Sequence, residues 1–291
     1  MLEFVVTEEY DGRRLFVFLR GQGVSASQIR SVKYDEDGIS VNGKRAKTNQ
    51  IVRKNDSVAV KHPESSTVLV PCADIVPIVY ESDEAIVFDK PAGMATHPTR
   101  NQPEGTLANV FARIMLQRGV GATFRPVNRL DKNTSGLVLV AKSRFATEKL
   151  LKSARKKYAA VAEGTFEAKE ETVNMPIARC GDSIIKRCVS ENGDRSVTHF
   201  AVVGEGGGHS LLEVEIFTGR THQIRVHMSW LCHPLAGDSL YGGSDRLIAR
   251  QALHCKELTF TEPISKKEIA LKSPMPRDME ALIKSLDISD K

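Results

Sequence analysis

A single acidic residue stands out in the segment RPVNRLDKNTSGLVLVAKS, residues 125–143. Asp131 follows Arg129 by two positions and precedes the small polar run TSG and an apolar stretch. A lone aspartate at the end of a strand is most often a turn residue that bonds its own backbone. In an extended segment, however, residues 129 and 131 share a face, and the apolar flank predicts a rigid scaffold with room for a ligand beside the TSG run. Asp131 is therefore a candidate nucleophile or a stabiliser of positive charge.

A second segment, TGRTHQIRVHMSWLCHPLAGDSLYGG at residues 218–243, is rich in arginine and histidine. His222 and His227 are five positions apart, which suits neither one helix face nor one strand face, and no acid completes a ligand set. We therefore predict no metal site. Arg220, His222 and Arg225 instead favour a cationic surface that faces phosphate or carboxylate. The HPLAGDSLYGG part is interpreted as a structural, turn-rich loop.

The composition narrows the class of protein. The 291 residues carry a formal charge of +5, which permits a polyanionic partner without proving one. Five scattered cysteines without a C-x-x-C pair indicate neither a disulfide framework nor a zinc site. The acidic N-terminal stretch does not read as a signal peptide, and no apolar run reaches the roughly 18 residues of a membrane helix. The expected location is the cytoplasm, with no membrane association.

Residues 1–62 are predicted to form a small module. Apolar residues at helical spacing in 11–23, a second short helix, an Asn42-Gly43 hairpin signal and a last strand ended at Pro63 follow in order. The module has 11 Lys and Arg against 8 Asp and Glu, so it carries +3 of the total +5. Residues 63–74 are rich in Pro and Ser and read as a linker.

Residues 75–291 are expected to hold the larger domain, in which strands and helices must position the candidate residues. Two strands joined by a turn are predicted in 75–93, an amphipathic helix in 106–119, a strand in 136–143 and a basic helix in 144–157. Further strands are expected in 158–166, 196–217 and 251–263. Strand pairs with short turns favour an α+β fold, with a mixed, mainly antiparallel sheet flanked by helices.

Four segments together resemble the RluA-type pseudouridine synthase family: VFDKPAGMATHP, NRLDKNTSGLVLVAKS, KKYAAVAEGTF and the 218–243 segment. They cover residues from about 75 to 262. The resemblance implies isomerisation of uridine to pseudouridine in RNA without a cofactor. Residues 1–62 resemble, more loosely, the S4-like RNA-binding module that often precedes this catalytic domain.

The family's site residues map onto this sequence by motif. The resemblance implies that Asp131 is the catalytic aspartate, that Arg225 pairs with it, and that Arg129 enters the RNA when the target nucleotide flips out. Tyr158 would pack on the base or act as a base. Lys90 of VFDKPAG joins Arg129, Arg220 and His222 as a substrate-binding residue. Asn128 departs from the His that the family commonly has there, and we expect it to bond backbone behind the site.

One carboxylate is enough for the implied reaction. The C1′–N1 bond breaks, the uracil turns, and a C1′–C5 bond forms, so no water needs activating and no second carboxylate is required, unlike in glycoside hydrolysis. An arginine partner favours the charged form of a carboxylate and orients it. Attack on C1′, attack on C6 of uracil, and assistance to loss of a C2′ proton all stay open at this point.

The expected function is an RNA pseudouridine synthase acting on large-subunit ribosomal RNA, with no obligatory protein partner. Transfer RNA is the alternative substrate, because an S4-like module points only weakly to the ribosome. A non-catalytic RNA-binding or ribosome-associated factor would be free to lose Asp131, Tyr158 and Arg225, and all three are present. A phosphodiesterase would need a metal set or a paired acid and base, and the sequence offers neither.

Overall fold

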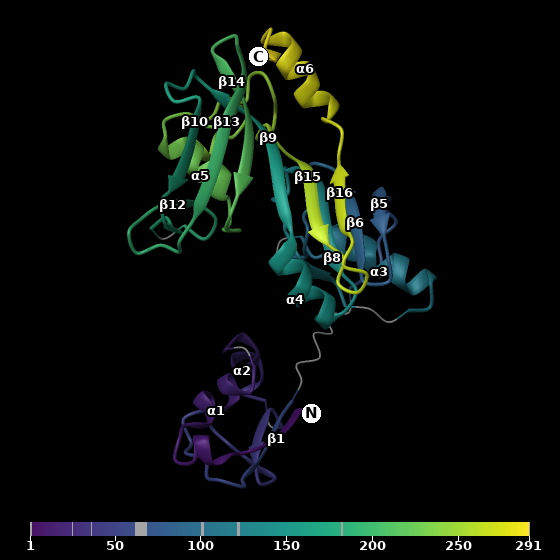
Figure 1. Cartoon of the computed structure of the whole chain (residues 1–291), viewed down its shortest axis with the longest axis vertical. Coiled ribbons are helices and arrows are strands. Elements are labelled where there is room, and N and C mark those ends of the chain that lie inside the picture. The colour runs from purple at the N-terminus through teal and green to yellow at the C-terminus, as the bar shows by residue number, and fades with distance from the viewer. Residues whose placement is uncertain are drawn as a thin grey trace. The chain divides into compact units, whose positions relative to one another are not determined.

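The computed structural model describes residues 2–24, 26–35, 37–61, 69–99, 102–120, 123–181 and 183–290. The chain forms two compact units, residues 1–68 and 69–291, here called the small and the large unit (Figure 1). Of the expected linker, residues 63–68 lie outside the described residues. Leu69 and Cys72 pack against the core of the large unit, and the Val70 carbonyl accepts a hydrogen bond from Asn109, so residues 69–74 belong to that unit.

The small unit is an antiparallel sheet covered by two helices. The strand order is β1 (Leu2–Val5), β4 (Ser57–Val60), β2 (Ile39–Val41) and β3 (Lys44–Arg45). The hairpin predicted from Asn42-Gly43 is confirmed: both residues have positive φ, 51° and 73°, as a two-residue type I′ turn requires. Apolar residues of α1 (Leu15–Gly21) and α2 (Ala26–Val32) form its core with the strands. Strand β1 was not predicted.

The large unit is built on one sheet. Within the described residues the main path runs β10 (Glu170–Asn174), β13 (Val197–Gly206), β14 (His209–Ile216), β9 (Arg155–Glu163), β15 (Leu253–Thr261), β8 (Ser135–Ala141), β6 (Ala85–Lys90) and β5 (Ile78–Glu81). Strands β7 (Arg125–Pro126), β16 (Glu268–Lys272) and β17 (Ser289–Asp290) join its sides. The β8–β15 pair is parallel and the other pairs are antiparallel, which confirms the predicted mixed, mainly antiparallel sheet.

Helices flank this sheet. They are α3 (Leu107–Gln117), α4 (Arg144–Ser153), α5 (Gln223–Trp230) and α6 (Arg277–Ser285). The basic helix predicted for 144–157 ends at Ser153, because the apolar run that follows is drawn into β9 at the centre of the sheet. A separate two-stranded hairpin, β11 (Ile177–Arg179) and β12 (Arg187–Val189), packs beside α5 (Figure 1). No described helix has the length and apolarity needed to cross a bilayer.

The TSG run after Asp131 combines a close backbone contact with an open side, since Thr134 lines a cavity of about 510 Å³ beside Asp131, as expected from the sequence. A Cβ on Gly136 would lie 2.3 Å from the Cys255 carbonyl oxygen, and its φ of +110° favours glycine. Ser135 Oγ hydrogen-bonds His254 Nδ1 at 2.9 Å. The run therefore serves the close parallel contact between β8 and β15, and so fixes the start of β8.

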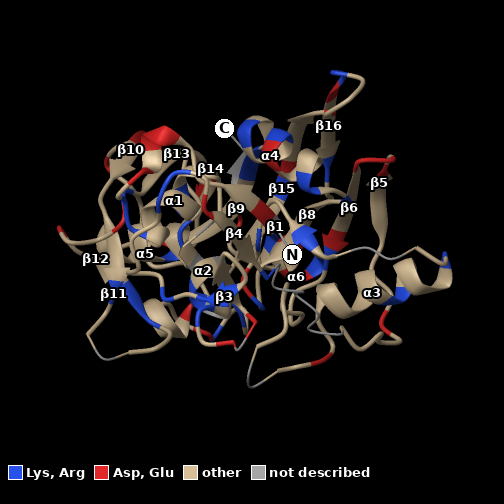
Figure 2. Ribbon diagram, turned by 90° about the horizontal axis from the view of Figure 1, so that it is seen from below, with Lys and Arg blue, Asp and Glu red and all other residues tan. Residues whose placement is uncertain are grey.

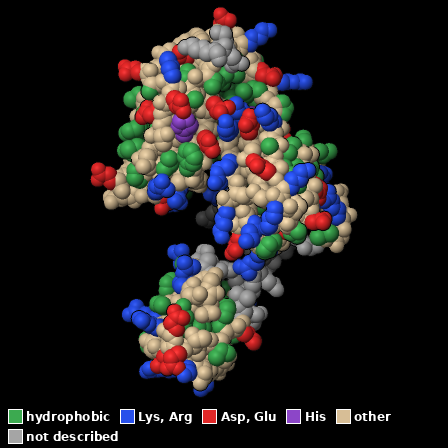
Figure 3. All heavy atoms as spheres, viewed as in Figure 1, with side chains coloured by type: hydrophobic (Ala, Val, Ile, Leu, Met, Phe, Trp, Pro, Cys, Tyr) green, Lys and Arg blue, Asp and Glu red, His purple; other side chains and the backbone are tan. Residues whose placement is uncertain are grey.

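Charged side chains occur on both units. Figure 2 shows Lys and Arg at β3 in the small unit and at β11 in the large one. On the face drawn in Figure 3, Lys and Arg side chains of both units are interspersed with Asp and Glu. Positive and negative side chains of the described residues are thus mixed on this face.

Candidate active site

A cavity of about 510 Å³ opens in the large unit, and it is called the main cavity below. It gathers six of the seven predicted site residues from segments far apart in the sequence: Arg129, Asp131, Tyr158, Arg220, His222 and Arg225 all line it. The seventh, Lys90, is not among the lining residues. The motifs thus place six residues around one cavity, and Lys90 lies outside its lining.

Asp131 is held by its neighbours' backbone. It lies in a tight turn just before β8, where the Thr134 N–H donates to its carbonyl at 3.1 Å. Thr96 Oγ1 donates to the Leu130 carbonyl at 2.8 Å, and Lys90 Nζ donates to the Lys132 carbonyl at 3.3 Å. The backbone on both sides of the carboxylate is therefore fixed, while its side chain stays 26% exposed toward the cavity.

Lys90 is a supporting residue in this geometry, which corrects its assignment as a substrate-binding one. Its side chain is fully buried, and Nζ also donates to the carbonyls of Pro91 and Met94 at 2.8 and 2.7 Å. Burial lowers the pKa of Lys90 to about 7, despite the opposing attraction of Asp131. The ammonium group faces backbone oxygens and ties the 90–94 segment to the Asp131 turn.

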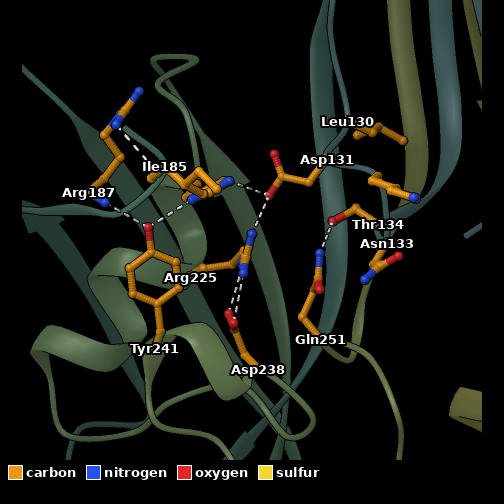
Figure 4. A network of polar contacts seen from close by, with 12 residues as sticks. Leu130, Asp131, Asn133, Thr134, Ile185, Arg187, Arg225, Asp238, Tyr241 and Gln251 are labelled. Carbon is orange, nitrogen blue, oxygen red and sulfur yellow. Dashed lines mark hydrogen bonds and ion pairs between the residues drawn. The ribbon is translucent and has the colours of Figure 1, made fainter. Parts of the chain in front are cut away.

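Arg225 links Asp131 to a second carboxylate. Its Nη1 donates to Asp131 Oδ2 at 3.0 Å, while Nε and Nη2 form a bidentate pair with Asp238 at 2.7 and 2.8 Å (Figure 4). Burial alone would lower the pKa of Arg225, but Asp238 and Asp131 outweigh it and raise that pKa above its usual value. The guanidinium stays charged, and its fork geometry sets where the Asp131 oxygen lies.

His222 approaches Asp131 from another side. It precedes α5 with a left-handed φ of 59°, and its Nε2 lies 3.8 Å from Asp131 Oδ2. Tyr241 Oη accepts the Arg187 backbone N–H at 3.0 Å and shares a hydrogen bond with His222 Nδ1 at 2.8 Å. Burial lowers the pKa of His222, partly offset by Asp131, so the ring is neutral at neutral pH.

Tyr158 forms part of the cavity wall from β9. Only 4% of the residue is exposed, and its pKa is raised well above the usual value by burial, with smaller contributions from Cys255 and Asp131. The hydroxyl is therefore a neutral phenol at neutral pH. Its ring can pack against a planar base.

Arg129 and Arg220 are exposed residues of the cavity wall. Arg220 donates from Nε to the Arg195 carbonyl at 3.2 Å, and its Nη1 lies 3.5 Å from Asp194 Oδ2. Asn128 also borders the cavity, but its amide bonds the backbone of β8 at Leu137 and Leu139. The expected role of position 128 as a backbone-bonding residue agrees with this geometry.

Sequence reasoning missed Asp238 and Tyr241. Both lie in the segment interpreted as a structural loop, and both contact predicted site residues directly. The available signal was an acid flanked by glycines in GDSLYGG, within the motif that holds Arg225. Another histidine of that motif, His227, is structural, since its ring nitrogens bond Thr198 and the Met175 carbonyl at 2.8 and 2.9 Å.

Comparison with known proteins identifies the family. The sequence profile of RNA pseudouridylate synthase matches residues 84–230. The RNA pseudouridine synthase YjbO of Bacillus subtilis is 40% identical over 270 residues, which are 90% of this chain and 95% of its own. Ribosomal large subunit pseudouridine synthase D of Xanthomonas campestris is 34% identical, covering 97% of this chain and 91% of its own.

Solved structures agree on the fold. Human RNA pseudouridylate synthase domain containing 4 superposes with a TM-score of 0.59 at 22% identity, over 73% of this chain and 93% of that one. Human RNA pseudouridylate synthase domain containing 1 gives 0.55 at 24%, over 74% and 96%. The RluA-type resemblance is thereby confirmed: this chain belongs to the RNA pseudouridylate synthase family and is an isomerase that makes pseudouridine in RNA.

Proposed function

We propose that the chain isomerises uridines of large-subunit ribosomal RNA and that Asp131 is its single catalytic carboxylate. The substrate rests on relatives: proteins of Xanthomonas campestris, Zymomonas mobilis and Vibrio vulnificus, 34–37% identical, are named ribosomal large subunit pseudouridine synthase D. The catalytic role rests on one observation. Asp131 reaches the main cavity as a partly exposed carboxylate whose position is set by Arg225, which Asp238 fixes in turn.

The reaction needs positive charge on the ribose and negative charge on the departing uracil to be stabilised together. As the C1′–N1 bond breaks, Asp131 faces the sugar and supplies the negative charge. Arg225 Nη1 donates to Asp131 Oδ2, and His222 Nε2 lies 3.8 Å from the same oxygen. When C1′–C5 has formed, the C5 proton leaves and N1 gains one, so the product has the composition of the substrate.

The other wall residues orient the base. Tyr158 offers a neutral aromatic ring for stacking, worth roughly 1–3 kcal/mol per base. Arg129 stands at the exposed side of the cavity, where its guanidinium can occupy the place that a flipped uridine leaves in the RNA. Residues 1–62 of the small unit, which carry +3, act as an S4-like RNA-binding module that adds salt-dependent affinity.

Replacement of Asp131 tests this proposal. Full-length protein is mixed with transcripts of large-subunit ribosomal RNA or of transfer RNA, each carrying 5-tritiated uridine, and release of tritium to water is counted. Asp131→Asn is expected to lose at least about a thousandfold in rate, or roughly 4 kcal/mol of barrier. Its RNA affinity should stay within twofold of the wild type.

Asp245→Asn, an exposed aspartate that lines neither cavity of this unit, is the matched control and should release tritium normally. Wild-type turnover by Asp131→Asn would remove the carboxylate from the chemistry. Release from transfer RNA alone would replace the proposed substrate.

A further inference from the structure

A second cavity, of about 360 Å³, lies next to the main one and has no role in the chemistry above. It is called the arginine cavity, because Arg129, Arg179, Arg187 and Arg220 line it together with the single acid Asp194. Four guanidinium groups against one carboxylate give its wall a formal charge of +3. Arg129, Gly219, Arg220 and Thr221 line both cavities, so the two are contiguous.

The β11–β12 hairpin places two of these arginines directly opposite each other. In its antiparallel register Arg179 pairs with Arg187. Like charges directly opposite in a strand pair are destabilising, and an anion bound between or above the two groups would offset the repulsion. The hairpin is also a fixed platform: Ile177 is buried against Val226 of α5 and against Tyr241.

The partners of the four guanidinium groups show which charges remain available. Arg187 Nη1 donates to carbonyls of its own turn, at Ile184, Ile185 and Lys186, and Arg220 is close to Asp194. Over the ranges that the structure describes, the side chains of Arg129 and Arg179 have no hydrogen bond or ion pair. Arg129 and Arg179 therefore line the arginine cavity as two exposed arginines without an acidic partner among the described residues.

We propose that the arginine cavity binds the RNA backbone phosphate next to the target uridine, while the uridine itself enters the main cavity. Arginine suits this ligand, because its planar fork matches two phosphate oxygens at once. Arg129, shared by both cavities, then stands where the strand passes from one to the other. The inference rests on the proposed function, since it takes ribosomal RNA as the substrate and the main cavity as the place that receives the target uridine.

A chain of hydrogen bonds connects the two cavities rigidly. The Arg187 backbone N–H donates to Tyr241 Oη, Tyr241 Oη and His222 Nδ1 share a hydrogen bond, and His222 Nε2 lies 3.8 Å from Asp131 Oδ2. The hairpin that would hold the phosphate is therefore anchored to the residues around the carboxylate. A phosphate bound there fixes the distance between the backbone and the reacting uridine.

Arg179 is the most informative residue to change, because its side chain makes no hydrogen bond or ion pair with a described residue that truncation would break. With the ribosomal RNA transcript, Arg179→Ala is expected to raise KM and the dissociation constant about tenfold, with kcat within twofold of the wild type. The slope of log affinity against log salt should fall by about 1, the value for one phosphate contact. Arg179→Lys should keep most of that slope, and Arg179→Glu should weaken binding about a hundredfold.

Arg277→Ala serves as the control, since this exposed arginine of α6 lines neither cavity. Affinity is measured by fluorescence anisotropy of end-labelled RNA, separately from tritium release, so that the subsite is decided even if turnover fails. Wild-type affinity and salt slope in both Arg179→Ala and Arg179→Glu would overturn the subsite. Full activity of Asp131→Asn would overturn the catalytic proposal and leave the subsite standing.

Discussion

Two buried arginines of the large unit have the same kind of partner and different uses. Arg225 binds Asp238 through Nε and Nη2 at 2.7 and 2.8 Å, and Arg250 binds Asp278 through the same atoms at 2.6 and 2.8 Å. The difference lies in Nη1. That of Arg225 donates to the Asp131 carboxylate in the main cavity, whereas that of Arg250 donates to backbone carbonyls.

One of those carbonyls belongs to Asn133, two residues after Asp131, at 3.2 Å. Arg225 therefore orients the Asp131 side chain. Arg250 connects the backbone turn that contains Asp131 with Asp278 of α6. An arginine–aspartate pair is thus no functional signature by itself. The group that the remaining guanidinium nitrogen faces decides whether the pair serves the chemistry or the scaffold.

Asp238→Asn should have the larger effect on activity. An asparagine amide has one acceptor oxygen and a donor nitrogen, so it cannot form the two-oxygen pair with the guanidinium fork. Arg225 is then free to turn, and Asp131 loses its fixed orientation. We expect kcat to fall about a hundredfold, or about 2.7 kcal/mol of barrier, with little change in KM for RNA. Single-turnover tritium release measures this. A rate within threefold of the wild type would mean that Asp131 does not depend on the Arg225–Asp238 pair.

Asp278→Asn is the matched change in the second pair and should affect stability instead. Asp278 is 45% exposed, so solvent weakens the pair, and we expect unfolding free energy to drop by about 1 kcal/mol. Activity should stay within threefold. Fluorescence of Trp230, the single tryptophan and part of the large unit, follows urea unfolding of that unit.

The pH dependence of this stability term has a defined sign. Burial tends to raise the pKa of Asp278, but Arg250 outweighs it and holds that pKa below its usual value. A carboxylate whose folded pKa is lowered stabilises the fold above its unfolded pKa, and this contribution is lost as pH falls through the folded value. The difference between wild type and Asp278→Asn should be constant from about pH 8 to 5 and shrink below about pH 4. A difference that grows in acid would contradict this origin.

The sequence predicted much of the site because its motifs are local. The segments around residues 131, 158 and 220–225 each contribute residues to the lining of the main cavity, so each motif alone indicates a part of the site. Pairings between segments were not readable. The Arg225–Asp131 and Arg250–Asn133 contacts span 94 and 117 positions, and only the folded sheet brings them together.

The errors have physical reasons of the same kind. Lys90 shows its charge in the sequence but not the direction of its side chain, which is buried among carbonyls. Helix α5 was missed because its Gln, Arg and His residues are buried together with its apolar ones, so no amphipathic pattern marks it. Polar residues bonded inside a core hide the helical period.

Tyr158→Phe should have a smaller effect than Asp238→Asn. Since burial keeps the pKa of Tyr158 high, a phenolate base is not available at neutral pH, and the ring survives the change. We expect kcat within tenfold of the wild type and an unchanged KM. A fall in kcat of a hundredfold or more, the usual contribution of a general base, would show that the hydroxyl moves a proton. Leu253→Ala, at another wall position, controls for packing.

Asn128→His should have the smallest effect, because position 128 supports strand β8 and does not contact Asp131. Its amide nitrogen donates to the Leu137 carbonyl at 3.0 Å, and its oxygen accepts the Leu139 N–H at 2.8 Å. A neutral imidazole also has one donor and one acceptor, so it can keep at least one of these bonds. We expect activity within threefold and the same profile from about pH 5 to 8, where an unperturbed histidine titrates. If the activity of the variant shows a new titration at about 6.5, the reference pKa of histidine, position 128 contacts the reacting groups. It would then belong to the active site and not only to the support of strand β8.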